Sequence, residues 1–497
     1  MENEQTGKAF PTGRKELVFG FATLCAGLLL INSILFGGFS LGFAIGYILC
    51  LLCSALYLVC SGHRPSNYSF LLLFLSLVIA ASFARLDDSP VKFVMFCFLL
   101  VSTNLGLCLM AGKNRHTPGA VRSLEDAAAT LFSLGVGELP ASYRGLHNAF
   151  RGSGTIGQKS GAILLGLGIT VPLLLIIVPL LMQADAAFEG MLRYFPSFSF
   201  PEFFGTVVFG GCLGFVLYTR NTALQYKETI PSVQRPRKGV SPLTVNTVLI
   251  AICLVYCAYL ASQLAYFTGG LSGILPEDYT LAEYARRGFF EMAWLCAINL
   301  AIILFALTVC AKENGTPLST RLFCLFIGIV TLFFIIAASA KMILYIDSFG
   351  LTRLRVLTQV VMVFFAVVTV LVSVWLFVPK LPYMKAVMIS ALLIGAAVSW
   401  ADVDTQVARY NVSQYLSGQA KTVDVDYLTS LGSGAVPYLA KLAQEAPDTA
   451  VLDSARFYID NHWCGNPHDF RDWNYVNHIA SEILGDSPSA VTDTTHP

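Results

Sequence analysis

The feature that most restricts the fold of this chain is a series of long apolar runs. Several of them exceed the roughly 18 to 20 residues that a helix needs to cross the hydrocarbon core of a bilayer. Of all residues, 55% are hydrophobic and only 13% are charged, whereas soluble domains carry about 25% charged residues. Helices satisfy their own backbone polar groups inside lipid. The sequence therefore predicts an all-α, polytopic membrane protein.

The apolar runs predict about eleven membrane-spanning helices. The third run is short, so the helix count between residues 69 and 111 is the least determined part of this prediction. The predicted spans are 17–36, 41–60, 69–84, 92–111, 161–183, 203–220, 243–266, 288–311, 322–345, 354–379 and 382–400.

The basic residues predict the orientation of these spans. With the N-terminus in the cytoplasm, 19 Lys and Arg residues fall on the cytoplasmic side and eight fall in external loops. The cytoplasmic excess comes mainly from residues 112–160 and from residues 220–241, a loop in which Arg220 is counted. Lys and Arg are enriched in cytoplasmic loops of membrane proteins. An odd number of spans then places the C-terminal tail outside.

The predicted organisation has six parts. They are a cytoplasmic N-terminus (1–16), four membrane helices (17–111), a cytoplasmic amphipathic loop (112–160), seven further membrane helices (161–400), an acidic extracytoplasmic helical domain (401–485) and a disordered tail (486–497). Residues 401–497 contain thirteen acidic and five basic residues. Helical spacing within the acidic domain predicts about four short helices: 402–416, 424–446 with breaks at Gly432 and Pro437, 448–462 and 470–484.

Three glycines recur every four residues near the second span, at Gly38, Gly42 and Gly46. Small residues at this spacing let two helix backbones approach closely. Packing within the chain is the first interpretation, and self-association into a homo-oligomer is the alternative.

Ionisable residues at membrane depth are costly and therefore mark candidate functional positions. Two such groups lie at the external ends of the eighth to tenth spans. They form one candidate external polar site: Glu283, Arg286, Arg287, Glu291, Lys341, Tyr345, Asp347, Arg353 and Arg355. Such a site would bind an anionic lipid headgroup or a small solute, while the alternative is a set of structural ion pairs at the interface. Asn299 and Gln359 would either line the same cavity or bond neighbouring helices.

No catalytic, metal or cofactor motif is recognisable. Phosphate-binding, nucleophile-elbow and zinc-protease patterns are missing from the sequence. Four residues of the tail are possible metal ligands, but their spacing fits no established zinc pattern, so we expect no metal: His462, Cys464, His468 and His478. We expect no cofactor and no nucleic-acid partner. Membrane lipid is the expected environment, and a protein partner remains open.

Three stretches of the chain carry a family resemblance. They are Tyr284 to Glu291 followed by Asn299-Leu300, Tyr345 to Arg355, and Ala408 to Val412 with Asp424 to Pro437. Together they resemble a bacterial membrane family, domain of unknown function 4173, formerly grouped with 4153. The resemblance covers about residues 160–485 and implies a multi-pass protein of the bacterial cytoplasmic membrane. It supplies no activity, and it gives no support to the N-terminal spans.

Two classes of function follow. The first is a non-enzymatic membrane protein that senses, transports or scaffolds through an external polar cavity capped by the tail. The second is a membrane enzyme acting on a lipid-linked substrate at the outer leaflet, with Glu283, Glu291 and Asp347 as the nearest acids. Neighbouring arginines favour ionised carboxylates, which suit ion pairing better than general-acid catalysis.

Overall fold

The computed structural model describes residues 9–85, 89–118, 122–152, 200–227, 240–270, 289–310, 316–461 and 470–484. Within these residues the secondary structure is helical, and the only β feature is an isolated bridge between Val240 and Cys310. The all-α prediction is confirmed.

Within the described residues, nine helices are long and apolar enough to cross a membrane, and one apolar helix is shorter. The short one is α3 (Asn67–Ser82), the span whose limits were hardest to predict. Each of ten predicted spans corresponds to a helix, while the fifth, 161–183, lies outside the described residues. The long helices are α1 (Arg14–Phe36), α2 (Leu41–Cys60), α4 (Ser89–Met110), the continuous stretch of α9 (Phe200–Gly205), η3 (Thr206–Gly210) and α10 (Gly211–Tyr226), α11 (Pro242–Gly270), α13 (Phe289–Val309), α14 (Leu318–Phe349), α15 (Arg353–Phe377) and α16 (Tyr383–Ala401).

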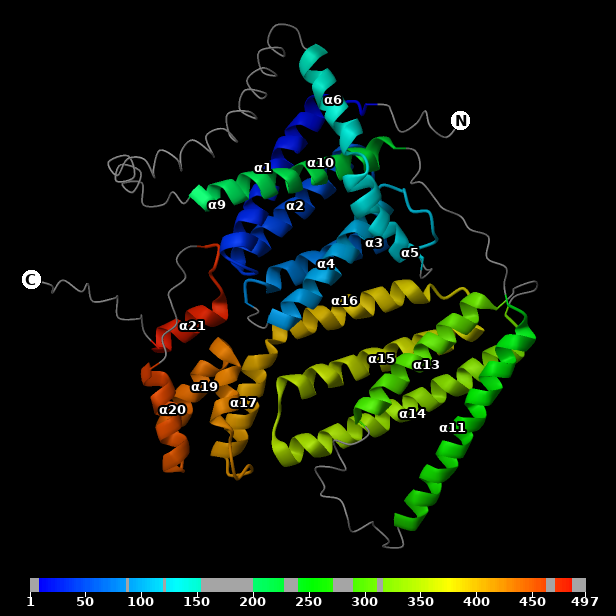
Figure 1. Ribbon diagram of the computed structural model, residues 1–497, viewed down its shortest axis with the longest axis vertical. Coiled ribbons are helices and arrows are strands. Elements are labelled where there is room, and N and C mark those ends of the chain that lie inside the picture. Colours follow the sequence, from blue (N-terminus) through cyan, green and yellow to red (C-terminus); the bar gives the residue numbers. More distant parts are fainter. Residues whose placement is uncertain are drawn as a thin grey trace, which may run out of the picture.

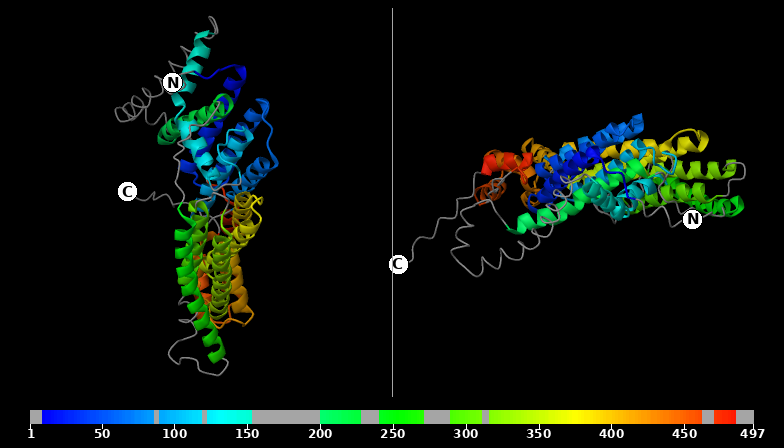
Figure 2. Two further views of the ribbon diagram at one scale, coloured as in Figure 1. Left: turned by 90° about the vertical axis from the view of Figure 1, so that its right-hand side faces the viewer. Right: turned by 90° about the horizontal axis from the view of Figure 1, so that it is seen from above.

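The helices form two groups (Figure 1), and each contributes to a different apolar core. The first helix group consists of α1–α4 and α9–α10, and the second consists of α11 and α13–α15. The core of the first group also includes residues of α16 and of the C-terminal tail. Helix α16 packs against α3 and α4 on one side and against α15 on the other, so it joins the groups. Figure 2 shows the same division from the side.

Glycines bring the helices of the first group close together. A Cβ atom on Gly27 of α1 would lie 2.8 Å from the backbone nitrogen of Gly214 in α10, and one on Gly46 would lie 2.8 Å from Cα of Leu30. Such distances are closer than van der Waals contact, so these positions require glycine. Gly42 and Gly46 therefore pack within the chain, as the first interpretation expected. Gly38 does not share their helix face, because it lies in the preceding turn with a φ of 68°.

The described part of the 112–160 loop lies at the ends of the first-group helices. Within this loop α5 (Ser123–Ala129) continues as the π-helix η2 (Thr130–Val136). Helix α6 (Leu139–Gly152) follows, where the sequence predicted no helix, and the Ala141 carbonyl accepts from the Phe10 amide at 3.3 Å. The N-terminal segment and this loop thus share one end of the bundle.

The tail domain lies at the opposite end of the long helices, shown in orange and red in Figure 1. Its helices match the predicted pattern: α17 (Val403–Leu416), α18 (Val425–Ser430), the 3₁₀ turn η4 (Gly432–Ala435), α19 (Val436–Glu445), α20 (Thr449–Asn461) and α21 (Tyr475–Leu484). Asp402, at the joint between α16 and α17, has a φ of 52° and is 1% exposed. Its Oδ2 accepts from the Thr405 hydroxyl at 2.6 Å, and Asp tolerates this left-handed conformation better than most residues.

Candidate functional site

The described residues include only some members of the predicted external polar site. Glu283, Arg286 and Arg287 lie outside the described residues. Glu291 on α13 and Asp347 on α14 are exposed. Lys341, on α14, lies within electrostatic range of the Glu291 carboxylate.

Tyr345 lies near the end of α14 and Arg355 lies in the first turn of α15, on the two sides of the turn that joins these helices. The Arg355 guanidinium lies 4.2 Å from the centre of the Tyr345 ring, a cation–π contact. Its Nη1 also donates to the carbonyl oxygens of Phe349 and Gly350, at the end of α14. Carbonyls at a helix C-terminus lack intrahelical partners and carry partial negative charge. Arg355 therefore fixes a turn, which is a structural role.

Arg353 connects the membrane helices to the tail domain. Its Nε and Nη2 each donate to the Asp404 carboxylate of α17 at 2.6 Å. Its backbone amide donates to the Tyr427 hydroxyl at 2.8 Å. Next to this pair, the Asn411 side chain of α17 accepts from the Leu351 amide at 2.8 Å and donates to the Leu351 carbonyl at 2.7 Å. We call this set the α17 contact, and its bidentate ion pair is the strongest type of charged hydrogen bond.

The segment leading into α21 binds the first helix group at the same end of the bundle. Arg471 donates to Glu202 at 3.0 Å and to Asn32 at 3.3 Å. The Leu41 amide donates to the Trp473 carbonyl at 3.0 Å, and the Tyr475 amide donates to the Ala84 carbonyl at 2.9 Å. We call this set the α21 contact. The tail domain is thus attached to both helix groups.

Arg353 and Arg355 lie two positions apart in the first turn of α15, and their side chains have different partners. Arg353 faces the tail domain and Arg355 faces Tyr345. The pairing with Asp404 was not predicted, because no local pattern links residues that are 51 positions apart.

Asn299 bonds neighbouring helices in the core of the second group. It accepts from the Tyr256 hydroxyl of α11 and donates to the Thr331 hydroxyl of α14 at 3.0 Å. Thr331 in turn donates to the Ile327 carbonyl at 2.7 Å. We call Tyr256, Asn299 and Thr331 the neutral network. Gln359 is separate, with its amide 3.4 Å from the Ser339 carbonyl.

A second buried polar centre lies in the first group, around Arg220. The sequence prediction that Arg220 belongs to a cytoplasmic loop is wrong, because α10 continues to Tyr226 and buries the arginine to 4% exposure. Its Nη2 donates to Ser54 at 2.7 Å and to Asn221 at 3.3 Å, and its Nη1 donates to Asn104 at 3.2 Å. Its Nε is buried and has no hydrogen-bond partner among the residues that the structure describes.

A sequence signal for this centre exists on α2. Polar residues recur there at spacings of three and four, which places them on one helix face: Tyr47, Cys50, Ser54, Tyr57 and Ser61. The first four are buried. Such a stripe within an apolar helix indicates a polar partner on a neighbouring helix.

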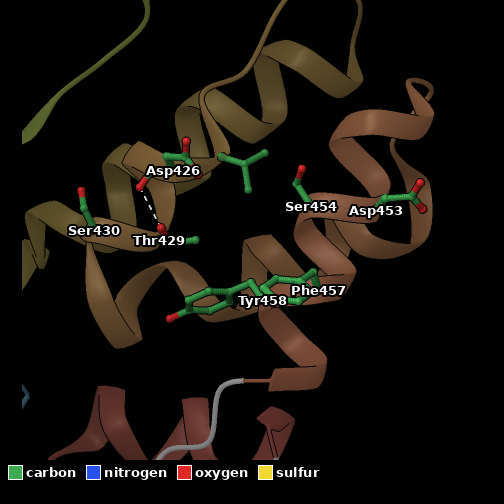
Figure 3. Close-up of a pocket in the computed structure, with 8 residues that line it drawn as sticks. Asp426, Thr429, Ser430, Asp453, Ser454, Phe457 and Tyr458 are labelled. Atoms are coloured by element: carbon green, nitrogen blue, oxygen red, sulfur yellow. Dashed lines mark hydrogen bonds between the residues drawn. The ribbon is translucent and has the colours of Figure 1, made fainter.

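The tail domain has a pocket of about 750 Å³ between α18 and α20 (Figure 3). Asp426, Thr429 and Ser430 line it from α18, and Asp453, Ser454, Phe457 and Tyr458 line it from α20. None of these lining residues is basic. The lining thus offers two carboxylates, three Ser and Thr hydroxyls and two aromatic rings. Such a lining suits a ligand with several hydrogen-bond donors.

Most of the possible metal ligands of the tail lie outside the described residues. His462, Cys464 and His468 lie outside the described residues. His478 lies 3.6 Å from Glu482 of its own helix and near the Trp473 ring. The described residues hold no cluster of three or more metal-ligating side chains.

Comparison with known proteins gives one family match, over residues 24–442. No curated protein and no solved structure matches the chain. The match includes the N-terminal spans and stops within α19, so the expected range of 160–485 was wrong at both ends. The expected group 4173 was also wrong, and the related group 4153 is the one that matches. Because the match covers most of a chain with many membrane-spanning helices, the protein is a polytopic member of the family described as domain of unknown function (DUF4153).

Proposed function

We propose that this protein is a membrane sensor in which the tail domain transmits the binding of a small solute to both helix groups. The observation that carries the proposal is the double attachment of the tail, through the α17 contact and the α21 contact. A domain fixed at two points to separate helix groups changes their relative position whenever its own shape changes.

The pocket between α18 and α20 supplies a site where such a change would begin. It is lined by α18, which packs against α19 and α20, and Tyr427 of α18 accepts from Arg353 in the α17 contact. A ligand that alters the spacing of α18 and α20 would therefore alter the α17 contact. Solutes with hydroxyl or ammonium groups fit the acidic and hydroxyl lining.

Transport and catalysis have weaker support. The arginines expected in an external cavity, Arg353 and Arg355, are used for the tail attachment and for a helix end. Of the acids considered for catalysis, Glu283 is outside the described residues, and Glu291 and Asp347 are exposed on different helices.

A double-mutant cycle tests the proposed transmission. Asp404→Ala weakens the α17 contact and Arg471→Ala weakens the α21 contact, and we expect their effects on the stability of the purified protein to couple by 1 kcal/mol or more, about what shared networks show. Lys441→Ala is the matched control, because Lys441 is exposed and its ion pair is with Glu445 of its own helix, outside both contacts. Additivity of Asp404→Ala with Arg471→Ala within about 0.5 kcal/mol would show independent attachments and exclude transmission.

The ligand class is tested with N-acetylglucosamine as the hydroxyl probe and spermidine as the ammonium probe. We expect one of them to raise the unfolding midpoint of the full chain, since a ligand that binds only the folded state stabilises it. The shift should disappear in Asp426→Asn/Asp453→Asn and persist in Asp448→Asn, an exposed tail carboxylate outside the pocket.

We also propose that the tail domain is outside the cytoplasm in a bacterial cytoplasmic membrane. The excess of Lys and Arg at the opposite end of the bundle supports this orientation. Cysteines introduced at the exposed positions Lys421 and Asp448 should react with an impermeant maleimide in intact cells. Their protection, with labelling of an introduced cysteine at Arg64 instead, would reverse the orientation.

A further inference from the structure

No acidic side chain of the described residues pairs with the buried guanidinium of Arg220. Its hydrogen-bond acceptors are a serine hydroxyl and two asparagine amides. The ionisable groups close enough to interact with its charge are the Tyr47 phenol and the Cys50 thiol, both of which are ordinarily neutral near pH 7. The described acidic side chains therefore leave this charge uncompensated.

An uncompensated charge is unfavourable at this depth. Arg220 lies six residues before the end of α10 at Tyr226, about 9 Å inside the helix end at 1.5 Å per residue. Its neighbours Ser54, Asn104 and Asn221 are each at most 3% exposed. Burying an unpaired ion costs several kcal/mol, so a folded state that retains Arg220 in this environment implies a negative charge beside it.

Three buried polar atoms of α10 have no hydrogen-bond partner among the described residues: the hydroxyls of Tyr218 and Thr219 and Nε of Arg220. The last of these carries the charge of the guanidinium and is the atom that concerns a ligand. Buried polar atoms in native proteins are nearly always hydrogen-bonded. The Nε–H of arginine can only donate, so a ligand that satisfies it must accept a hydrogen bond.

We propose that Arg220 binds a small monovalent inorganic anion, such as chloride, in the core of the first helix group. The anion accepts from Arg220 Nε and balances its charge, while Ser54 and Asn104 hold the guanidinium from α2 and α4. The close burial of the surrounding side chains limits the ligand to a small ion.

The test measures the unfolding midpoint of the purified full chain in sodium chloride and in sodium gluconate of equal ionic strength. Gluconate is too large for the site and controls for screening. We expect chloride to raise the wild-type midpoint in a saturable manner, and Arg220→Met, which keeps the length of the side chain without its charge, to lose this shift. Arg64→Gln should keep it, because Arg64 is exposed at the same end of the helices.

Two outcomes would overturn the anion site. One is an equal midpoint in chloride and gluconate for the wild type, which would mean that water or a carboxylate of this chain satisfies Arg220. The other is an unchanged chloride shift in Arg220→Met. If that variant does not fold, chloride-35 relaxation of the wild type decides: line broadening that bromide reverses supports the site, and broadening equal to that of a buffer blank excludes it. Failure here leaves the tail-domain sensor untouched, since that proposal involves other residues.

Discussion

The two helix groups bury polar side chains of different kinds. In the second group the neutral network of Tyr256, Asn299 and Thr331 pairs each of its polar side chains with another helix or with its own backbone. In the first group Arg220 brings a full charge among neutral partners and keeps an unbonded Nε. A neutral, satisfied network is explained by helix packing, whereas a buried charge with no acidic partner among the described residues is costly. The comparison therefore supports the proposal of an anion site in the first group.

The largest expected difference between the two helix groups is the strength of the ion pair by which each binds the tail domain. Asp404→Ala leaves the Arg353 guanidinium without its bidentate partner, and Asp404 is 2% exposed. We expect a loss of about 3 kcal/mol, near the lower limit for breaking a buried pair. Glu202→Gln, at the more exposed Arg471 pair, should cost less than about 1 kcal/mol. Unfolding midpoints together with limited proteolysis of the tail measure both, and equal losses would remove the distinction.

The next largest expected difference is the loss of stability when a glycine at a helix contact is replaced by alanine. Gly27→Ala in the first group forces a Cβ to 2.8 Å from backbone nitrogen, which cannot rotate away, and we expect a loss of about 2 kcal/mol. Gly328→Ala in the second group meets the Ser373 hydroxyl at 2.9 Å, and a hydroxyl can change rotamer. The Gly328 variant should therefore lie within about 0.5 kcal/mol of wild type. A larger effect at Gly328 in thermal unfolding would contradict this difference.

The neutral network should contribute modestly. Thr331→Val removes the hydroxyl that accepts from Asn299 while keeping the branched shape of the side chain. Hydrogen bonds between membrane helices contribute about 0.6 kcal/mol on average and up to about 1.7, so we expect a loss of about 1 kcal/mol. Asn299→Leu in the same background should then add less than it does alone. Losses above about 3 kcal/mol would mean that this network, too, has a role beyond packing.

The smallest expected effect is the pH dependence of the α17 contact. Burial raises the pKa of Tyr427 above its usual value near 10, although its hydrogen bond from Arg353 opposes the shift. A raised folded-state pKa means that the full stability is present below about pH 10 and declines as the pH rises through the folded-state value. Wild-type midpoints should fall more steeply between pH 9.5 and 11, a range about the pKa of tyrosine, than those of Tyr427→Phe. Parallel curves would show that Tyr427 does not titrate there.

Hydrophobic length was sufficient to predict the described membrane helices, because a span needs only apolar residues and enough of them. The helices of the tail followed from Gly432, Pro437 and the spacing of its apolar residues, which are local signals. Helix α6 was missed because its overall hydrophobicity is too low for it to stand out as an apolar run, although its apolar residues gather on one face, which is a helix signal that the sequence did offer.

The candidate site was harder to predict, because contacts between distant residues leave no local pattern. Arg353 and Arg355 were found as charged residues at membrane depth, but their partners Asp404 and the Gly350 carbonyl depend on the turn between α14 and α15. Arg220 was assigned to a loop because a charge was taken to end the apolar run. The uncharged Asn221 and Thr222 and the apolar Ala223 that follow it show that the helix continues past the charge.

The α21 contact has a consequence for the biosynthesis of the protein. Arg471 bonds to Asn32, 439 residues earlier in the chain, and Trp473 bonds to Leu41 at the start of the second helix. Ribosomes add about 5 to 20 residues per second, so the first two helices wait tens of seconds in the membrane before this partner is made. During that interval the turn at Gly37 is uncovered, and it becomes closed only after the tail has been translated. Ribosomes stalled before and after residue 471 should therefore carry nascent chains that differ in the accessibility of this turn to a labelling reagent.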